Sequence, residues 1–152
     1  MPCDTVAIRV MRAEDYDGVY DLWIHTPGMG LNTVDDSREG IEKYLKRNPT
    51  TSFVAVCGSS VVGVIMSGHD GRRGYIHHTA VLPAYRGQGI AQKLVEHAID
   101  ALDKEGIIKA NLVAFRDNDI GNGFWEHIGF HERVDLVYRD KAIHPFELVK
   151  TK

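Results

Sequence analysis

The chain has 152 residues, of which 43% are hydrophobic, so it is large enough for one domain built on one core. Its 18 Lys and Arg residues against 21 Asp and Glu residues give a net charge of -3, which argues against a general electrostatic grip on nucleic acid. The longest apolar runs have about six residues, too few to span a bilayer. The first residues show no basic and then apolar export signal, so we expect a cytoplasmic protein.

Hydrophobic periodicity and turn residues predict a single domain over residues 1–152 that mixes strands and helices. In chain order we expect a strand at 5–11, helices at 13–23 and from 36 to 48, strands at 52–57, 61–68 and 75–82, a helix at 88–104, a strand at 110–115, a helix from 118 to 127, and closing strands at 130–139 and 145–149. This order predicts a mixed sheet with helices packed on its faces.

Two local details concern the second helix and the cysteines. Asp36 is followed by Glu39 three residues later, which predicts a capping box with Asp36 as the N-cap. Cys3 and Cys57 are too few for a disulfide framework, and we expect buried or idle thiols because neither has an activating neighbour in the sequence.

The sharpest signal is a glycine-containing turn between the strand that ends at Pro83 and the long helix. The residues of this turn and of the first helical positions are Arg86, Gly87, Gln88, Gly89, Ile90 and Ala91. The first N–H groups of a helix have no internal partner, and the helix dipole adds about half a positive charge there. Gly87 and Gly89 let an anion approach these donors, and Arg86 adds a charged fork for phosphate oxygens. The turn therefore predicts a pyrophosphate site, although a helix start without a ligand remains an alternative.

The same segment resembles the R-x-x-G-x-G/A acyl-CoA signature of the GNAT superfamily, matched by Arg86, Gly89 and Ala91. Residues 118–130 resemble the second conserved segment of that superfamily, N-x-x-A-x-x-F-Y-x-x-x-G-F. The resemblance covers nearly the whole chain. It implies a GNAT-type α/β (α+β) fold, with a mixed, mostly antiparallel central sheet of six to seven strands and about four helices on its faces.

The resemblance also implies contacts to acetyl-CoA. Backbone groups of Val81 and Leu82 should pair with the pantetheine arm, Asn118 should contact it, and Phe124 should pack close to it. The N–H groups expected to hold the pyrophosphate are those of Gln88, Gly89, Ile90 and Ala91, with Arg86 nearby. The superfamily shapes its acceptor pocket beside the loop at 25–34, which Trp23, His25, Met29 and Asn32 flank.

Two residues depart from the superfamily pattern. Gly121 stands where an alanine is usual, at a cost in helix propensity of about 1 kcal/mol. Trp125 stands where many members have the tyrosine that protonates the leaving thiolate. An indole N–H is not a useful acid, so we expect Trp125 to form a wall beside the thioester end of CoA.

A proton acceptor is sought on the strand before the pyrophosphate turn. The resemblance places a carboxylate of many superfamily members at the position of His77, and histidine has a pKa suited to neutral pH. Strict alternation would put His77 on the face of Val81 and His78 on the opposite face. His77 and His78 are therefore the candidate catalytic residues, in that order, beside the alternative that both are satisfied structural histidines.

The resemblance implies an N-acetyltransferase that transfers an acetyl group from acetyl-CoA to a primary amine by direct attack in a ternary complex. The alternatives left open are a non-catalytic acyl-CoA-binding or sensing module, which Trp125 favours, and transfer of a larger acyl group. The expected partners are acetyl-CoA and an amine-bearing acceptor, with no nucleic acid, no membrane and no metal; a homodimer is left open.

Overall fold

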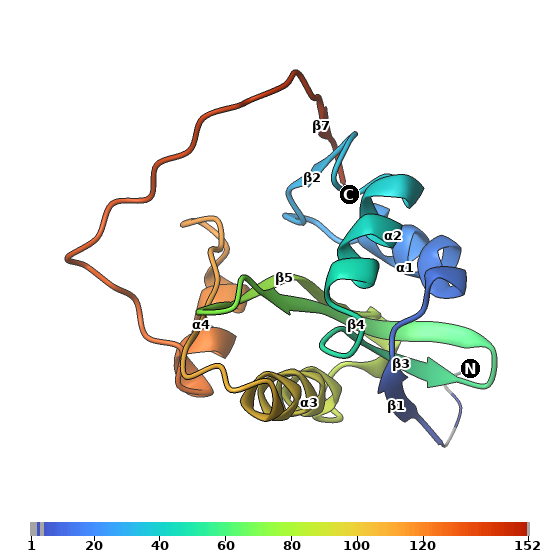
Figure 1. The fold of residues 1–152 in the computed structure, drawn as a ribbon. Helices are drawn as coiled ribbons and strands as arrows, with labels where there is room; N and C mark the ends of the chain where they lie inside the picture. Colours follow the sequence, from blue (N-terminus) through green and yellow to red (C-terminus); the bar gives the residue numbers. More distant parts are fainter. Residues whose placement is uncertain (1–2, 4, 152) are drawn as a thin grey trace.

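In the computed structural model, which describes residue 3 and residues 5–151, a five-stranded sheet forms the centre of the fold (Figure 1). Its strands, in spatial order, are β1 (Ala7–Val10), β3 (Phe53–Cys57), β4 (Ser60–His69), β5 (Gly74–Val81) and β6 (Ala110–Asn111). All neighbours are antiparallel except β5 and β6, which are parallel. The prediction about an export signal lies outside the described residues, apart from Cys3.

Helices cover both faces of this sheet, as Figure 1 shows. The helices are α1 (Tyr16–Ile24), preceded by a 3-10 turn at Ala13–Asp15, α2 (Arg38–Arg47), α3 (Ile90–Lys104), preceded by a 3-10 turn at Pro83–Tyr85, and α4 (Asp119–His127). Helices α1 and α2 lie on one face and α3 on the other. The predicted mixed α/β fold with four helices is confirmed.

Side chains of β4 pack into two separate hydrophobic clusters, one on each face of the sheet. Val62 and Ile65 pack with Leu94 on the α3 face, whereas Val64 packs with Trp23 on the α1–α2 face. All five side chains are almost fully buried, so β4 is covered on both sides and its register is strongly specified. The sheet therefore provides a rigid platform for the residues of β5 beside it.

The C-terminal part of the chain differs from the prediction. The expected strand at 110–115 pairs only at Ala110–Asn111, and residues 130–139 form no strand. From the expected strand at 145–149 only β7 (Leu148–Val149) forms, and it pairs with β2 (Leu31–Asn32) in a separate two-stranded sheet. The central sheet consequently has five strands rather than six to seven.

The central sheet lacks the expected closing strands because of the course of residues 131–147, which we call the C-terminal strap. The strap leaves the body in a wide arc before β7 returns to β2 (Figure 1). Its apolar side chains face solvent, with Val134 88% exposed and Ile143 89% exposed. The alternating pattern that predicts a strand is present, but tertiary pairing determines whether such a segment joins a sheet.

Two further observations concern the cysteines and the membrane. The structure pairs Cys3 with Cys57, whose Cα atoms are 6.1 Å apart, so the expectation of idle thiols is wrong. The two residues are 54 positions apart, and nothing local in the sequence brings them together.

Within residue 3 and residues 5–151, no helix is long and apolar enough to cross a membrane.

Candidate active site

The parallel strands β5 and β6 pair over only two positions and then separate. The pairs are Gly74 with Ala110 and Tyr75 with Asn111. Beyond them the remaining length of β5, from residue 76 to Val81, has β4 as a partner on one side and no strand of the described chain on the other. This free edge offers backbone donors and acceptors to an extended ligand, as an added strand would use them.

The free edge leads directly into the glycine turn and the first turn of α3. Helix α3 begins after Gly89 with no side chain capping its N-terminus. Gly87 and Gly89 have φ angles of 79° and 78°, which only glycine adopts at little cost, and an added Cβ at either position would meet no atom within 4 Å. Arg86 is exposed, and its Nε donates to the carbonyl oxygen of Val81 at 3.2 Å. The open, uncapped helix start is suited to an anion.

Helix α4 begins at the residue expected to contact pantetheine. The Asn118 side chain is its N-cap and accepts a hydrogen bond from the Gly121 N–H at 3.0 Å. A Cβ on Gly121 would overlap the Asn118 amide, so the glycine at this position makes room for the cap. Phe124 and Trp125 are partly buried against the α3 face, and the Trp125 ring meets the Phe130 ring edge-on at 5.2 Å. Trp125 therefore packs between α4 and Phe130 beside the α3 face, and its role toward CoA stays a prediction.

A β-bulge in β5 changes the faces predicted for the two histidines. The register with β4 pairs Met66 with His77 and Val64 with Ala80, so two residues of β5 lie opposite one of β4. His78 has a φ of 42°, a left-handed conformation that costs a non-glycine residue about 1 kcal/mol. Because the bulge interrupts the alternation, the strict-alternation prediction is wrong.

Because of the bulge, both histidines lie on the α1–α2 face. His77 meets the Tyr44 ring of α2 edge-on at 5.8 Å, and His78 meets the Trp23 ring of α1 at 5.1 Å. Val81 packs in the cluster on the opposite face. The two imidazole rings are 5.9 Å apart, so they share one environment.

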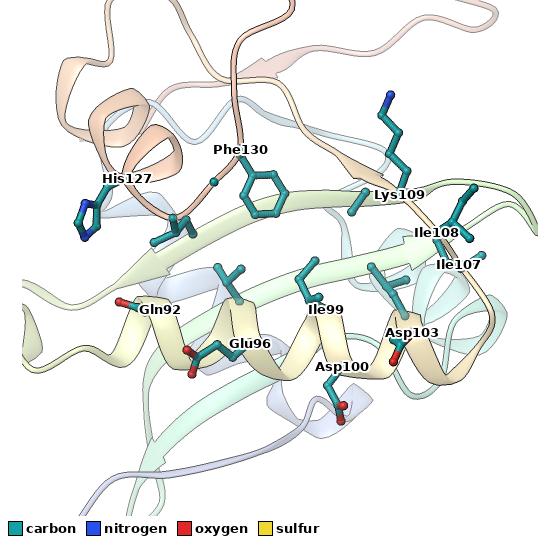
Figure 2. Close-up of a pocket in the computed structure, with 15 residues that line it drawn as sticks. Gln92, Glu96, Ile99, Asp100, Asp103, Ile107, Ile108, Lys109, His127 and Phe130 are labelled. Atoms are coloured by element: carbon teal, nitrogen blue, oxygen red, sulfur yellow. The ribbon is translucent and has the colours of Figure 1, made fainter.

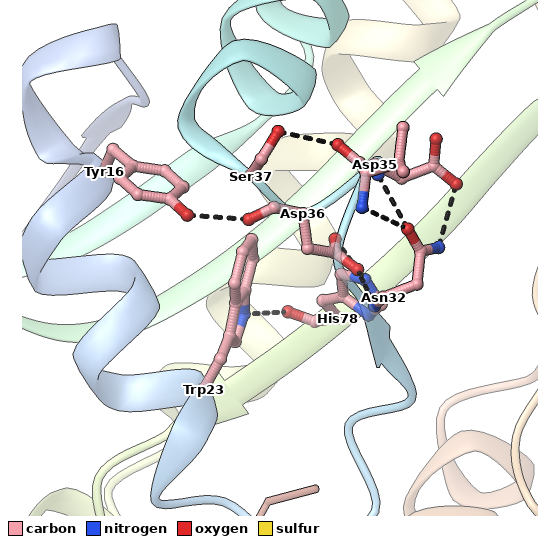
Figure 3. Close-up of polar contacts among 8 residues, drawn as sticks. Tyr16, Trp23, Asn32, Asp35, Asp36, Ser37 and His78 are labelled. Carbon is pink, nitrogen blue, oxygen red and sulfur yellow. Dashed lines mark hydrogen bonds and ion pairs between the residues drawn. The ribbon is translucent and has the colours of Figure 1, made fainter. Parts of the chain in front are cut away.

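His78 is held by a buried carboxylate from the loop before α2 (Figure 3). Its Nε2 lies 2.8 Å from Oδ1 of Asp36, a side chain only 5% exposed. Because an ionised carboxylate can only accept, Nε2 carries the hydrogen of this bond. The indole N–H of Trp23 donates to the His78 carbonyl oxygen at 3.1 Å, so the rotated peptide of the bulge is also fixed.

Asp36 is not the cap that the sequence predicts for α2. The N-cap is Ser37, whose Oγ accepts from the Gly40 N–H at 3.0 Å. Asp36 turns inward instead, and its Oδ2 accepts from the Asn32 N–H at 2.8 Å. The Tyr16 hydroxyl donates to the Asp36 carbonyl oxygen at 2.7 Å (Figure 3). Asp36 was therefore not predicted as a partner of His78, because either of two adjacent residues can cap the helix.

The imidazole of His77 packs between two tyrosine rings and forms no hydrogen bond with another described residue. Burial is the larger cause and the neighbouring His78 the second; together they lower the pKa of His77 from 6.5 to about 4, against the raising effect of Asp36 and Asp35. The Tyr44 hydroxyl beside it is buried, which raises the Tyr44 pKa, and has no hydrogen-bond partner among the described residues. His77 is therefore neutral near pH 7 and only weakly basic.

Two hollows lie near this framework. The larger, of about 1110 Å³, is a groove between α3 and the end of α4, where Ile99 and Phe130 point toward one another (Figure 2). It contains none of residues 86–91 and stays open because the chain leaves the body after Phe130. The smaller hollow, of about 360 Å³, lies between Gly30, Phe115 and Val149, where β2 and β7 meet. It adjoins the loop that was expected to shape an acceptor pocket.

No group of three or more His, Cys, Asp or Glu side chains suited to a metal ion occurs in the part of the chain that the structure describes. The groups that the site offers are backbone donors, the exposed Arg86 and the Asp36–His78 pair. Such a set can bind an anionic ligand at the α3 start and move a proton on the α1–α2 side of the sheet.

Comparison with known proteins agrees with this framework. The model of the acetyltransferase (GNAT) family matches residues 16–130. An acetyltransferase of Sodalis glossinidius is 36% identical over 136 residues, and one of Pectobacterium atrosepticum is 32% identical over 136 residues; each alignment covers 90% of this chain and 94% of the relative. The PaiA N-acetyltransferase of Thermoplasma acidophilum, solved in complex with coenzyme A, superimposes with a TM-score of 0.70 at 17% identity, over 97% of this chain and 99% of that one.

The fold and the relatives together define an acyltransferase enzyme. The chain belongs to the GNAT acetyltransferase family. The predicted resemblance is confirmed, and membership of an enzyme family favours catalysis over a module that only binds acyl-CoA.

Proposed function

We propose that this protein, acting as one domain over residues 1–152, transfers an acetyl group from acetyl-CoA to a primary amine by direct attack in a ternary complex. The observation that carries the proposal is the separation of β5 from β6, which leaves a free strand edge next to an uncapped helix start. Solved relatives in complex with coenzyme A support a ligand of this kind.

The acetyl donor, acetyl-CoA, would lie along this free edge of β5. The pantetheine arm would pair with the backbone of Val81 and Leu82, and Asn118, Phe124 and Trp125 would border it on the α4 side. The pyrophosphate would accept hydrogen bonds from N–H groups of the first turn of α3 and of the two residues before it, and from Arg86. The N–H groups meant are those of Gln88, Gly89, Ile90 and Ala91, beside the open turn at Gly87. Each charge-assisted hydrogen bond contributes roughly 1.5–3 kcal/mol.

The acceptor would enter from the α1–α2 side, through the small hollow between Gly30, Phe115 and Val149. A donor in the opening between β5 and β6 has its pyrophosphate at the α3 start and its thioester toward that hollow. Direct attack is supported because Cys3 and Cys57 are paired with each other, and the described chain has no further cysteine to carry an acyl group.

The test is turnover with purified protein. Acetyl-CoA is incubated with a mixture of polyamines, amino acids, aminoglycosides and peptides with free N-termini, and CoA release is followed by thiol titration. Mass spectrometry should identify an amine that has gained one acetyl group. Tight binding of acetyl-CoA by calorimetry with no CoA release for any amine class would instead support a binding module.

A further inference from the structure

We propose that His78 accepts the proton of the attacking amine through Nδ1, and that Asp36 is a positioning residue which holds the imidazole in the required tautomer. The inference rests on the proposed function, because it concerns the proton that an amine loses during acetyl transfer.

Three hydrogen bonds hold His78 in place: one to its ring, one to the carboxylate that binds the ring, and one to its backbone carbonyl. The Asp36 carboxylate accepts from Nε2 at 2.8 Å, and the same carboxylate is held by the Asn32 N–H at 2.8 Å. Trp23 holds the His78 carbonyl oxygen at 3.1 Å, which stabilises a backbone conformation with a φ of 42°. A left-handed histidine inside a bulge persists only because these contacts over-determine it, and such strain concentrates at functional sites.

With Nε2 protonated, the lone pair of the ring is on Nδ1. No described residue forms a hydrogen bond with Nδ1, and the His78 side chain keeps 17% of its surface exposed. A histidine that a buried carboxylate orients through one nitrogen presents the other nitrogen as a proton acceptor, as in hydrolase triads. The arrangement here has the same two elements, a buried carboxylate and a partly exposed imidazole.

The neighbouring histidine is less suited to this task. Burial and His78 lower the pKa of His77 to about 4, so at neutral pH His77 is a poor proton acceptor. Its ring is enclosed by Tyr44 and Tyr75, at 5.8 and 4.4 Å between ring centroids. Titratable side chains that contact or act on this pair of imidazoles include Asp35 and Asp36 of the loop before α2, Tyr44 of α2 and Tyr75 of β5, and the Tyr16 hydroxyl of α1 binds the Asp36 backbone.

Position also favours His78. The strand β2, which contributes Leu31 to the small hollow, donates the Asn32 N–H to Asp36, so the proposed acceptor pocket and the Asp36–His78 pair are one connected unit. The bulge lies in the part of β5 that has no strand on its outer side, where the thioester is proposed to lie.

The step balances as follows. The amine nitrogen forms a bond to the thioester carbonyl carbon, the carbon–sulfur bond breaks, and CoA leaves as a thiolate. The amine proton passes to Nδ1, directly or through one water, and gives an imidazolium that Asp36 stabilises through Nε2. The imidazolium then returns its proton to solvent or to the thiolate.

The test compares two variants of the pair with a matched control. His78→Gln and Asp36→Asn change the proposed pair. His69→Gln changes a second histidine–carboxylate pair, formed with Glu105 at 3.1 Å at the opposite end of β5. For each protein, kcat and KM are measured across the pH range with the best amine, and the acetyl-CoA affinity is measured by calorimetry.

We expect His78→Gln to lower kcat/KM about 100-fold or more near neutral pH and to remove the acidic limb of the wild-type profile, with acetyl-CoA affinity within twofold. Asp36→Asn should lower kcat about tenfold or more with little change in the KM for acetyl-CoA. His69→Gln should keep the wild-type profile. A His78→Gln enzyme with the full rate and the same limb would overturn the proposal.

A measurement on the unmodified protein keeps the proposal testable if a variant fails to fold. Nitrogen-15 shifts of His78, followed to the high-pH end of its own titration, should show a protonated Nε2 and an unprotonated Nδ1 in the neutral imidazole. A protonated Nδ1 would refute it. If the wild type binds no acetyl-CoA or acetylates no amine, the proposed function itself fails; normal wild-type turnover with unaffected variants refutes only the role of His78.

Discussion

The pyrophosphate site can be tested with one substitution at the start of α3 and its counterpart at the end. Gly89→Glu adds a side chain where Gly89 has a φ of 78° and where an added Cβ meets no atom within 4 Å. The left-handed backbone costs a non-glycine residue about 1 kcal/mol, and a carboxylate near a helix N-terminus recovers about 0.3–1 kcal/mol of that. The variant should therefore fold.

Its effect on the ligand is much larger than its effect on stability. A carboxylate roughly 6 Å from one phosphate charge repels it by about 0.7 kcal/mol in bulk water and about 2.8 kcal/mol at an effective dielectric of 20. Two phosphate charges give about 1.4 kcal/mol even at the weaker limit, which is a tenfold loss of affinity. The added side chain also blocks N–H donors of the first helical turn, so tenfold is a lower bound.

Gly106 is the matched control. It has a φ of 79°, an added Cβ there also meets no atom within 4 Å, and it follows the C-terminal end of the same helix. Calorimetry should show acetyl-CoA affinity at least tenfold weaker for Gly89→Glu and unchanged for Gly106→Glu. The loss in melting temperature should be larger for Gly106→Glu, because its carboxylate lies at the negative end of the helix dipole. Equal affinities in two folded variants would show that the pyrophosphate does not bind at the α3 start.

Three further predictions follow from burial. Trp125→Phe should keep most of the activity. Trp125→Ala should lower the free energy of unfolding, measured by urea titration, by about 2 kcal/mol, which is less than the loss expected for a fully buried tryptophan. Loss of turnover in Trp125→Phe alone would show that the indole N–H matters. The pKa of His77 is lower in the folded than in the unfolded protein, so the folded state favours the neutral imidazole. The free energy of unfolding should therefore be full above about pH 6.5 and fall by about 3 kcal/mol toward about pH 4. His77→Gln should remove that part of the pH dependence, and a His97→Gln control should not. Leu94→Ala, at a fully buried site, should lower the free energy of unfolding by about 3 kcal/mol, whereas Val134→Ala in the C-terminal strap should change it by less than about 0.5 kcal/mol. A large loss for Val134→Ala would mean that the strap packs on the body in solution.

Some features follow from the sequence alone because they depend on neighbours close in the chain. The helices at 88–104 and from 118 to 127 were predicted from local residues. The structure confirms both, although α3 begins at Ile90, two residues later than predicted, because Gly89 is its N-cap. The strands at 52–57 and 61–68 were likewise predicted, since these two β-rich runs flank a short turn, and they pair as β3 and β4. The helical stripe that buries Leu94 needs only a period of 3.6 residues.

Other features were decided only by the tertiary structure. Asp36 and Ser37 are equivalent as caps in the sequence, and the pairing with His78, 42 residues away, decides which of them turns inward. The bulge that brings His77 to the same face as His78 is set by the register between β5 and β4, and one extra residue reverses any assignment from alternation. The strap has a strand pattern that pairs with nothing in the sheet, because a strand needs a partner edge as well as a sequence.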